Sequence, residues 1–394
     1  MGLSTCRPGK HFVLIAALLM FSAAGGCKDR PWQLWHSYSA RFIDPASGRV
    51  FDPNGDQHTT SEGQAYALFF ALAANDRATF DRVLGWTQSN LAQGDLGVHL
   101  PAWLWGKNKS GQWAILDANS ASDADTWIAY TLLEAGRLWN SPSDAMLGRA
   151  MMALIAKSEV TDLPGFGPML MPGPTGFQQA NSWTLNPSYL PVFLFERFAA
   201  VDPEGPWRQI ALGIPRLLQQ GSRHGYAMDW VKYVPGDGFY PAINPAANAQ
   251  AGPAADTPCG GYDAIRVYLW AGMMDREDAA RAAILNAVPA MSAYLADHDA
   301  PPEKVDEEGI PSGKDGPVGF SAALLPYLRA FPDLSRAAAR QMIRLSVEKD
   351  AETGLYGKDK AYYDQSLTLF AMGFLDARFR FGSAGELKVE WKRQ

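Results

Sequence analysis

The sequence has few cysteines, few histidines and no excess of basic residues. Its 394 residues include three cysteines and six histidines, and neither type forms a cluster with metal-ligand spacing. The formal net charge is −6 and no basic run is present, which argues against a nucleic-acid partner. The zinc-protease, phosphate-loop, dinucleotide and serine-hydrolase signatures are also absent. We therefore expect no metal, no cofactor and no nucleic acid.

The first apolar run of the chain is too short to span a bilayer. It covers residues 13–21, follows the basic residues Arg7 and Lys10, and precedes small residues at 22–26. This order is typical of a cleaved secretory signal. We predict a signal peptide at 1–26 and a periplasmic or secreted mature chain without a transmembrane segment.

Cys27 directly follows the predicted signal and has two alternative fates. It stands after two glycines, which resembles a bacterial lipoprotein cleavage site, so one alternative is a lipid anchor. The other is a disulfide with Cys259, which an oxidising compartment permits. The sequence leaves both open.

From residue 27 onward, apolar residues recur with the spacing of buried helix faces. Ala65, Leu68, Phe69 and Leu72 form the first clear set. Further segments of this kind lie near 80–87, 128–139, 144–157, 187–200, 206–219, 262–274, 278–297, 319–329, 334–348 and 364–376. Most are joined by short loops, and no alternating run suggests a large sheet. We predict one all-α domain at 27–394, a ring of antiparallel helix pairs.

Three long stretches rich in proline and glycine interrupt the helical pattern, at 164–176, 235–261 and 301–319. Loops of this length in a compact domain are usually functional or disordered. Helical pairs of the same character resume on both sides, so none of the stretches is expected to link two domains. We expect these loops to gather at the rims of the ring.

One carboxylate stands at the start of the first of these helices. Glu62 lies within Thr60-Ser61-Glu62-Gly63-Gln64, directly after a Pro/Gly/Asp-rich loop at 52–56. A glycosidase needs such a carboxyl, held so that it keeps its proton and can give it to a leaving oxygen. The alternative is a capping box, because Thr59-x-x-Glu62 fits the pattern that begins many helices.

Two more acidic clusters follow, and each also has an ordinary structural interpretation. Asp123 and Asp125 begin a predicted helix, where Ser122-x-x-Asp125 could cap it and acids favour the helix dipole. Two acids this close cannot both cap well, so one is free to face a cleft. Asp263 stands three residues before Arg266, a spacing that permits an ordinary helical ion pair.

Several tryptophans lie outside the predicted helices. Trp103 and Trp105 follow a proline, and Trp183 and Trp230 follow polar residues. A flat aromatic ring can bury the CH face of a pyranose while nearby polar groups bind its hydroxyls. Core packing is the alternative. Together with the acidic clusters, these residues indicate acid/base hydrolysis of a sugar polymer.

Six short segments recur in order along nearly the whole mature chain. They are Thr60-Ser61-Glu62-Gly63-Gln64, Leu100-Pro101-Ala102-Trp103-Leu104-Trp105-Gly106, Ala121-Ser122-Asp123-Ala124-Asp125-x-x-Ile128-Ala129, Asn186-Pro187-Ser188-Tyr189-Leu190-Pro191, Tyr262-Asp263-Ala264-Ile265-Arg266-Val267-Tyr268 and Gly316-Pro317-Val318-Gly319-Phe320-Ser321. Together these segments resemble glycoside hydrolase family 8, and most of all the periplasmic endoglucanases encoded with bacterial cellulose synthases.

The resemblance implies an (α/α)6 barrel that hydrolyses β-1,4-glucan within the chain and inverts the anomeric centre. It implies Glu62 as the general acid. Asp263 matches the position usually taken as general base, although Asp123 is sometimes given that role or the role of nucleophile. We favour Asp263 as base, with Asp123 and Asp125 positioning the distorted sugar and the water. The implied partners are a cellulose or cello-oligosaccharide chain and a cellulose synthase complex.

The residues expected to contact the glucan are Asp125, Trp103, Trp105, Trp183, Trp230, Tyr189, Tyr262 and Arg266. Two other classes of function compete with this interpretation. A non-catalytic glucan-binding component of the export machinery would keep the tryptophans but would have no use for three acidic clusters. A polysaccharide lyase acts on acidic sugars and usually needs basic residues and a Tyr or His base.

Overall fold

The computed structural model describes residues 31–245 and 257–392. The predicted signal peptide, Cys27 and part of the 235–261 stretch lie outside the described residues. Among those that are described, no helix is both long enough and apolar enough to cross a bilayer.

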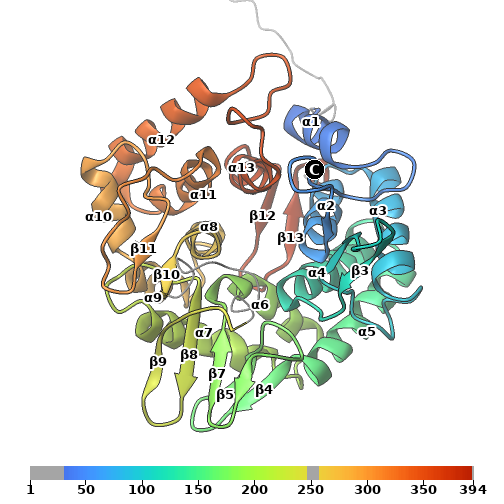
Figure 1. Ribbon diagram of the computed structural model, residues 1–394, viewed down its shortest axis with the longest axis horizontal. Coiled ribbons are helices and arrows are strands. Elements are labelled where there is room, and N and C mark those ends of the chain that lie inside the picture. The colour runs from blue at the N-terminus through green and yellow to red at the C-terminus, as the bar shows by residue number, and fades with distance from the viewer. Residues whose placement is uncertain (1–30, 246–256, 393–394) are drawn as a thin grey trace, which may run out of the picture. The chain divides into compact units, whose positions relative to one another are not determined.

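Helices in the described part of the chain form two concentric rings (Figure 1). The six inner helices are α2 Ser61–Ala73, α4 Ser122–Leu138, α6 Val192–Val201, α8 Ala264–Met273, α11 Val318–Leu328 and α13 Tyr362–Leu375. Their outer partners are α3 Arg77–Leu91, α5 Pro142–Ser158, α7 Trp207–Gly221, the short pair α9 Arg281–Ala287 and α10 Ala290–Asp297, α12 Ser335–Glu348, and α1 Gln33–Phe42. This arrangement is the predicted (α/α)6 barrel, and the fold prediction is confirmed.

The sequence of each helix decides which ring it joins. Every residue of α8 and α11 is buried, as expected for helices that are apolar on all sides. In contrast, α12 buries only Ala337, Ala338, Gln341 and Leu345, which form one stripe. Gly272 lets α8 approach α11 closely, because a Cβ at this position would lie 2.2 Å from the backbone nitrogen of Tyr327.

Short strands lie in the loops at the rims of the barrel. A three-stranded sheet contains β1 Thr59–Thr60, β2 Leu104–Lys107 and β3 Trp113–Asp117, and a four-stranded sheet contains β6 Gln178–Gln179, β7 Ser182–Leu185, β8 Trp230–Val234 and β9 Gly238–Ala242. Two further pairs are β4 Val160–Leu163 with β5 Gly167–Leu170, and β10 Cys259–Gly260 with β11 Val305–Asp306. Short strands therefore occupy part of each stretch that the sequence analysis treated as a loop.

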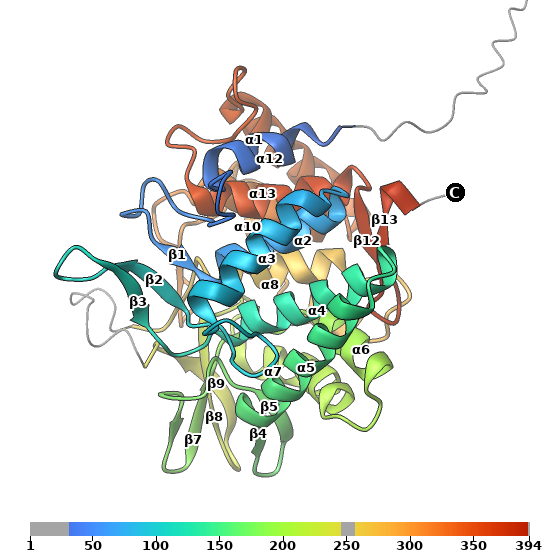
Figure 2. The same ribbon diagram turned by 90° about the vertical axis from the view of Figure 1, so that its right-hand side faces the viewer.

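A C-terminal hairpin, β12 Phe379–Phe381 with β13 Leu387–Val389, lies at the end of the barrel away from β2 and β3 (Figure 2). Its aromatic side chains enter the core between the inner helices. The ring of Phe381 stacks on Phe193 with centroids 3.8 Å apart, and Phe379 meets Phe69 edge-on at 4.9 Å. This hairpin fills the centre of the ring at that end.

Two helix predictions need correction, and one helix was missed. The segment near 278–297 is two helices, because Pro289 lacks an amide hydrogen and stands at the break between them. The helix near 187–200 begins only at Val192, after a 3-10 turn at Pro187–Tyr189. Helix α1 was not predicted, although Trp35, Tyr38 and Phe42 have the spacing of a buried face.

Candidate active site

Glu62 projects from the first turn of α2. The capping residue of this helix is Thr60, whose hydroxyl accepts a hydrogen bond from the amide of Gly63 at 3.2 Å. Thr59 instead donates its hydroxyl to the carbonyl of Val50 at 2.7 Å. The alternative interpretation, a capping box of Thr59 and Glu62, therefore does not hold.

Strand pairing places a tryptophan beside Glu62. The pairs Thr59–Trp105 and Thr60–Leu104 join β1 to β2, and the amide of Ser61 continues this contact by donating to the carbonyl of Trp103. The indole Nε1 of Trp103 then donates to Glu62 Oε1 at 3.1 Å. The other oxygen of Glu62 is buried and receives no hydrogen bond from the described residues.

The guanidinium of Arg266 joins two acidic residues from different helices. One nitrogen donates to Asp123 Oδ2 at 3.0 Å and to the Tyr66 hydroxyl at 2.9 Å, while the other donates to Asp263 Oδ1 at 2.8 Å and to the Ser188 hydroxyl at 2.8 Å. Arg266 is 5% exposed. The predicted i, i+3 ion pair of Asp263 and Arg266 is present, and it is part of a larger network at the starts of α4 and α8.

Asp263 is held at both of its carboxylate oxygens. Arg266 occupies Oδ1, and the side-chain amide of Asn186 donates to Oδ2 at 2.9 Å. Asn186 is fixed in turn by Ser188, whose hydroxyl and amide both donate to its carbonyl oxygen. The Asp263 side chain is 32% exposed, whereas that of Asp123 is 2% exposed. Of these two acids, Asp263 is therefore the one open to water.

The loop that carries Asp263 is anchored by Asp229. One oxygen of Asp229 accepts hydrogen bonds from the amides of Gly261, Asp263 and Ala264, at 2.8, 3.0 and 2.7 Å. These amides belong to the start of α8, where backbone donors have no partner within the helix. Asp229 therefore supplies the cap that Asp263 itself does not provide.

Asp125 lies beneath the surface of the site. Its side chain is fully buried, and neither oxygen has a donor among the described residues. Its neighbour is the buried carboxyl of Glu159, which accepts a hydrogen bond from Ser120 at 2.6 Å. The side chain faces Glu159 inside the protein, and the expected contact of Asp125 with a sugar stays a prediction.

Burial and charge separate the protonation states of these acids. Burial, helped by the charge of Asp123, raises the pKa of Glu62 to about 8. Burial raises the pKa of Asp123 to about 6, and the charge of Arg266 limits that rise. Burial together with Glu159 raises the pKa of Asp125 well above its usual range. Near neutral pH, Glu62 is protonated while Asp123 is ionised.

The predicted aromatic ligands fall into two groups. Trp103 and Tyr262 are 38% and 44% exposed, and Trp105 is half-buried and stacks on Trp113 with centroids 4.7 Å apart. Trp183 and Trp230 are buried in strands. Trp183 packs in the hydrophobic core, whereas Trp230 stacks on Phe177, so a sugar contact of Trp230 stays a prediction.

Tyr189 is half-buried beneath the guanidinium of Arg266, which lies 5.5 Å from its ring centroid.

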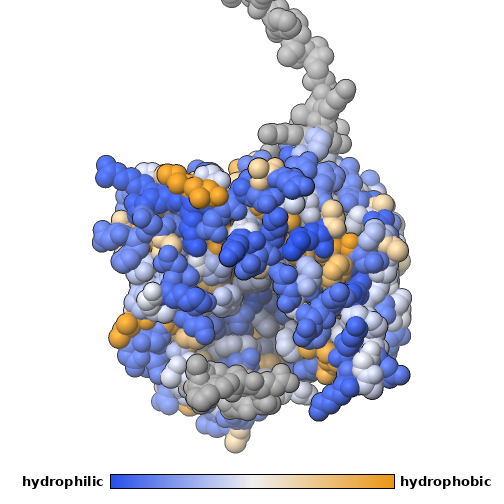
Figure 3. Space-filling view, turned by 45° about the horizontal axis from the view of Figure 1, so that its top comes forward, coloured by the Kyte–Doolittle hydropathy of each residue, from blue (hydrophilic) through white to orange (hydrophobic). Residues whose placement is uncertain are grey.

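The molecular surface in the view of Figure 3 is hollowed, and hydrophilic residues surround the hollow. Among the described residues, no group of three or more histidine, cysteine, aspartate or glutamate side chains could hold a metal ion.

A sequence model of the glycosyl hydrolases family 8 matches residues 7–377. The chain belongs to this family. Two curated relatives, both called endoglucanases, come from Xanthomonas axonopodis pv. citri and Escherichia coli K12. They are 45% and 43% identical over 96% and 97% of this chain, which corresponds to 94% and 96% of their own lengths.

Solved structures agree with the family assignment. An endo-1,4-D-glucanase from Vibrio fischeri ES114 has a TM-score of 0.80 and 36% identity over 92% of this chain and 100% of its own. The family 8 resemblance inferred from the sequence is thereby confirmed. This chain is a glycoside hydrolase, and the non-catalytic alternative is not supported.

The sequence analysis missed several residues of this family 8 site. Tyr66 stands four residues after Glu62 on the same helix face, so its place beside the site could have been predicted from this spacing. Asn186 and Ser188 were noted as part of a segment without a role. Asp229 and Glu159 had no local signal, because their partners lie in distant parts of the chain.

Proposed function

We propose that this family 8 enzyme is an endo-acting β-1,4-glucanase that cleaves cellulose or a related glucan with inversion. Glu62 is the general acid, Asp263 is the general base, and Asp123 positions the sugar. The observation that supports this proposal best is the difference between the surroundings of the three acids. Arg266 donates hydrogen bonds to Asp123 and Asp263, whereas burial raises the pKa of Glu62 to about 8. The names and lengths of the endoglucanase relatives support the substrate class.

Hydrolysis then proceeds in a single displacement. Glu62 gives its proton to the glycosidic oxygen as the bond to the anomeric carbon breaks. A water molecule attacks that carbon from the opposite face, and Asp263 takes one of its protons. An inverting enzyme leaves room for this water by holding the two carboxyls about 6.5–9.5 Å apart in the complex. The result is two shorter chains, one with a new reducing end.

The exposed aromatic rings of Trp103 and Tyr262 are proposed to bind glucose units on either side of the cleaved bond. Trp103 donates a hydrogen bond to Glu62, and Tyr262 directly precedes Asp263 in the sequence. Rings that bind sugar faces inside an extended chain fit endo action better than release of terminal units. We also propose that the mature chain works in the periplasm or outside the cell together with a cellulose synthase.

The decisive variant is Glu62→Gln. General acid catalysis usually contributes about 10²–10⁴-fold, so we expect a loss of this size in kcat on carboxymethylcellulose, measured by new reducing ends. Glucan binding should persist, because glutamine keeps the shape of the side chain. Glu352→Gln makes the same chemical change at an exposed position and should leave activity unchanged.

Two results would contradict the proposal. Retention of more than a few per cent of activity in Glu62→Gln would exclude Glu62 as the acid. Proton NMR of the first product of the wild-type enzyme should show the α anomer. An initial β anomer would indicate a retaining mechanism instead.

A further inference from the structure

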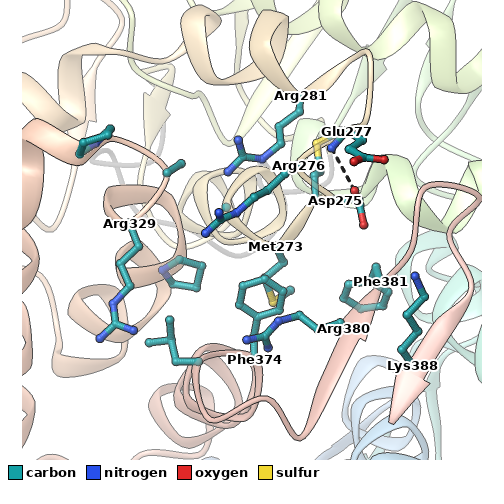
Figure 4. Close-up of a pocket in the computed structure, with 16 residues that line it drawn as sticks. Met273, Asp275, Arg276, Glu277, Arg281, Arg329, Phe374, Arg380, Phe381 and Lys388 are labelled. Carbon is teal, nitrogen blue, oxygen red and sulfur yellow. Dashed lines mark hydrogen bonds between the residues drawn. The ribbon is translucent and has the colours of Figure 1, made fainter. Parts of the chain in front are cut away.

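A cavity of about 780 Å³ lies away from the acidic site. Its wall includes Met273 in the last turn of α8, Arg329 just after α11, and Phe374 in the last turn of α13. Strands β12 and β13 complete it (Figure 4). Glu62 and Asp123 stand instead at the starts of their helices, so the cavity belongs to the opposite end of the barrel (Figure 2).

The wall of this cavity is strongly basic, although the whole chain has a net charge of −6. Two acidic residues line it, Asp275 and Glu277. The five cationic residues that line it are Arg276, Arg281, Arg329, Arg380 and Lys388. Cations gathered around one concavity attract an anion more strongly than the same cations spread over a surface.

Three of these arginines form no ion pair with any other residue in the described ranges: Arg276, Arg281 and Arg329. Burial and the charge of nearby Arg276 lower the pKa of Arg281. The Nε atom of Arg281 is also buried without a hydrogen-bond partner. Arg276 and Arg281 repel each other, and Arg276 and Arg329 are exposed. An anion placed among the three would therefore gain charge-assisted contacts that the protein does not supply.

Between the cations the cavity has an apolar floor. Figure 4 shows Met273 and Phe374 between the labelled arginines, with Phe381 to one side. The guanidinium of Arg380 lies 4.2 Å from the ring centroid of Phe374. Arginine donors around an aromatic surface can bind phosphate groups and a flat ring at the same time.

The ends of the helices offer an alternative explanation. Cations stabilise helix C-termini, and α8, α11 and α13 all end near this cavity. This explanation predicts that removing the cations destabilises the free protein. It gives no reason for a cavity of 780 Å³, a size within the range of about 300–1,000 Å³ for small-molecule sites.

We propose that this cavity binds a small polyanion, a phosphate ester carried on a flat or apolar ring. Arg276, Arg281 and Arg329 bind the phosphate oxygens, and Phe374 with Arg380 contacts the ring. The site is separate from the glucan-cleaving site and does not depend on the function proposed for it.

Isothermal titration calorimetry with the full mature enzyme tests the proposal. The probes are adenosine diphosphate, inorganic pyrophosphate and uncharged adenosine. We expect adenosine diphosphate to bind more tightly than pyrophosphate, and adenosine to show no binding. Affinity should fall steeply with added salt, because charge-assisted contacts are screened.

Paired variants locate the site. Arg276→Gln/Arg329→Gln should weaken binding of adenosine diphosphate at least tenfold without lowering the Tm of the free protein. Arg336→Gln changes an exposed arginine of α12 outside the cavity and should bind normally. Glu62→Gln should also bind normally, which separates this site from the catalytic one.

Several outcomes would overturn the proposal. Absence of binding, or equal binding by the double variant, would place no anion in this cavity. A lower Tm of the free double variant with unchanged binding would assign the arginines to the helix ends. Equal affinities for pyrophosphate and adenosine diphosphate would exclude a contact with the ring. Sedimentation with phosphatidylglycerol vesicles but no binding of the soluble probes would assign the phosphate to a membrane surface.

Discussion

Arg266 divides the carboxyl groups of the active site into two electrostatic classes. It donates to Asp123 and Asp263, and its charge limits the rise in the pKa of Asp123. No cation among the described residues donates to Glu62, and partial burial of its carboxyl favours the neutral form. A single buried cation therefore supports both the proposed acid and the proposed base of one site.

This division predicts a bell-shaped pH dependence. Activity should fall as the pH drops below about 6, because protonated Asp123 loses its charge contact with Arg266. It should also fall above about 8, where Glu62 loses the proton that it must donate. The measurement is kcat/KM on a soluble cello-oligosaccharide across pH 4–10.

Trp103→Phe provides the matched test of the alkaline limb. The indole donates a hydrogen bond that favours ionised Glu62, so its removal should raise the pKa of Glu62 and move the limb to higher pH. A limb that stays in place, or moves to lower pH, would show that another group controls it.

Asp229 is predicted to be a positioning residue for Asp263. Asp229→Ala leaves three backbone amides of the α8 start without their acceptor. Because a misplacement of about 1 Å can cost about 100-fold in rate, we expect a fall in kcat of that order with a smaller change in KM. Asp229→Asn keeps an acceptor oxygen and should recover most of the activity. A lower Tm with unchanged kcat would show a purely structural role.

At this scale the sequence predicted the residues that local motifs contain and missed those that tertiary contacts bring in. Glu62, Asp123 and Asp263 each stand in a short recognisable segment at a helix start. Asp229 reaches its partners across 32 residues or more, and nothing adjacent to it reveals them. The burial of Asp125 also depends on Glu159, which comes from a different helix end.

At the scale of elements, periodicity predicted the long helices better than the rim. Helices such as α4 bury a wide face and carry a strong repeat. The rim strands are two to five residues long, so they show too few alternations to be distinguished from loops. Pairing between distant segments creates them, as when β7 joins β8.

The C-terminal hairpin is held by one buried glutamate of α4. Glu134 is fully buried and forms ion pairs with Arg137 and Arg197. The Nε atom of Arg197 lies 2.6 Å from Glu134 Oε1. Glu134 also accepts a hydrogen bond from the backbone amide of Leu387 at 2.8 Å. This carboxylate therefore ties α4, α6 and the hairpin together. Its contacts are satisfied at both oxygens, as a buried charge requires.

Glu134→Ala should therefore destabilise the fold by about 3 kcal/mol, because removing one partner of a buried pair leaves uncompensated charge. Urea unfolding followed by tryptophan fluorescence gives the free energy of unfolding. Glu348→Ala is the control. The Glu348 side chain is 34% exposed and that of its partner Arg344 is 21% exposed, so this ion pair should contribute only about 0–1 kcal/mol to the free energy of unfolding. Equal effects of the two variants would contradict the role of Glu134.

At the scale of the whole molecule, the barrel separates its charges. Acids gather where inner helices begin, around Glu62, Asp123 and Asp263, and cations gather where α8, α11 and α13 end. The burial of several acids has a consequence for folding, because a buried carboxyl is easier to accommodate when it is protonated. Catalytic requirements thus act against stability at neutral pH.

The stability of the enzyme should therefore decrease as the pH rises from about 5 to 8. Folding raises the pKa of Glu62 to about 8 and that of Glu159 to about 7, so the folded state binds more protons than the unfolded state in this window. The contribution of these two protonated carboxyls to the free energy of unfolding is complete below their pKa values in the unfolded chain. It is lost as the pH rises through their pKa values in the folded protein. Asp44 and Asp350 have lowered pKa values and act only at more acidic pH.

Glu62→Gln should remove part of this dependence. The variant cannot ionise at position 62, so its Tm should exceed that of the wild type at pH 8 and differ little at pH 5. Since one pKa unit corresponds to about 1.4 kcal/mol and Glu62 is partly exposed, a gain on the order of 1 kcal/mol is expected at pH 8. Calorimetry at both pH values measures it. A Tm advantage of the same size at pH 5 would mean that packing, and not ionisation, is responsible.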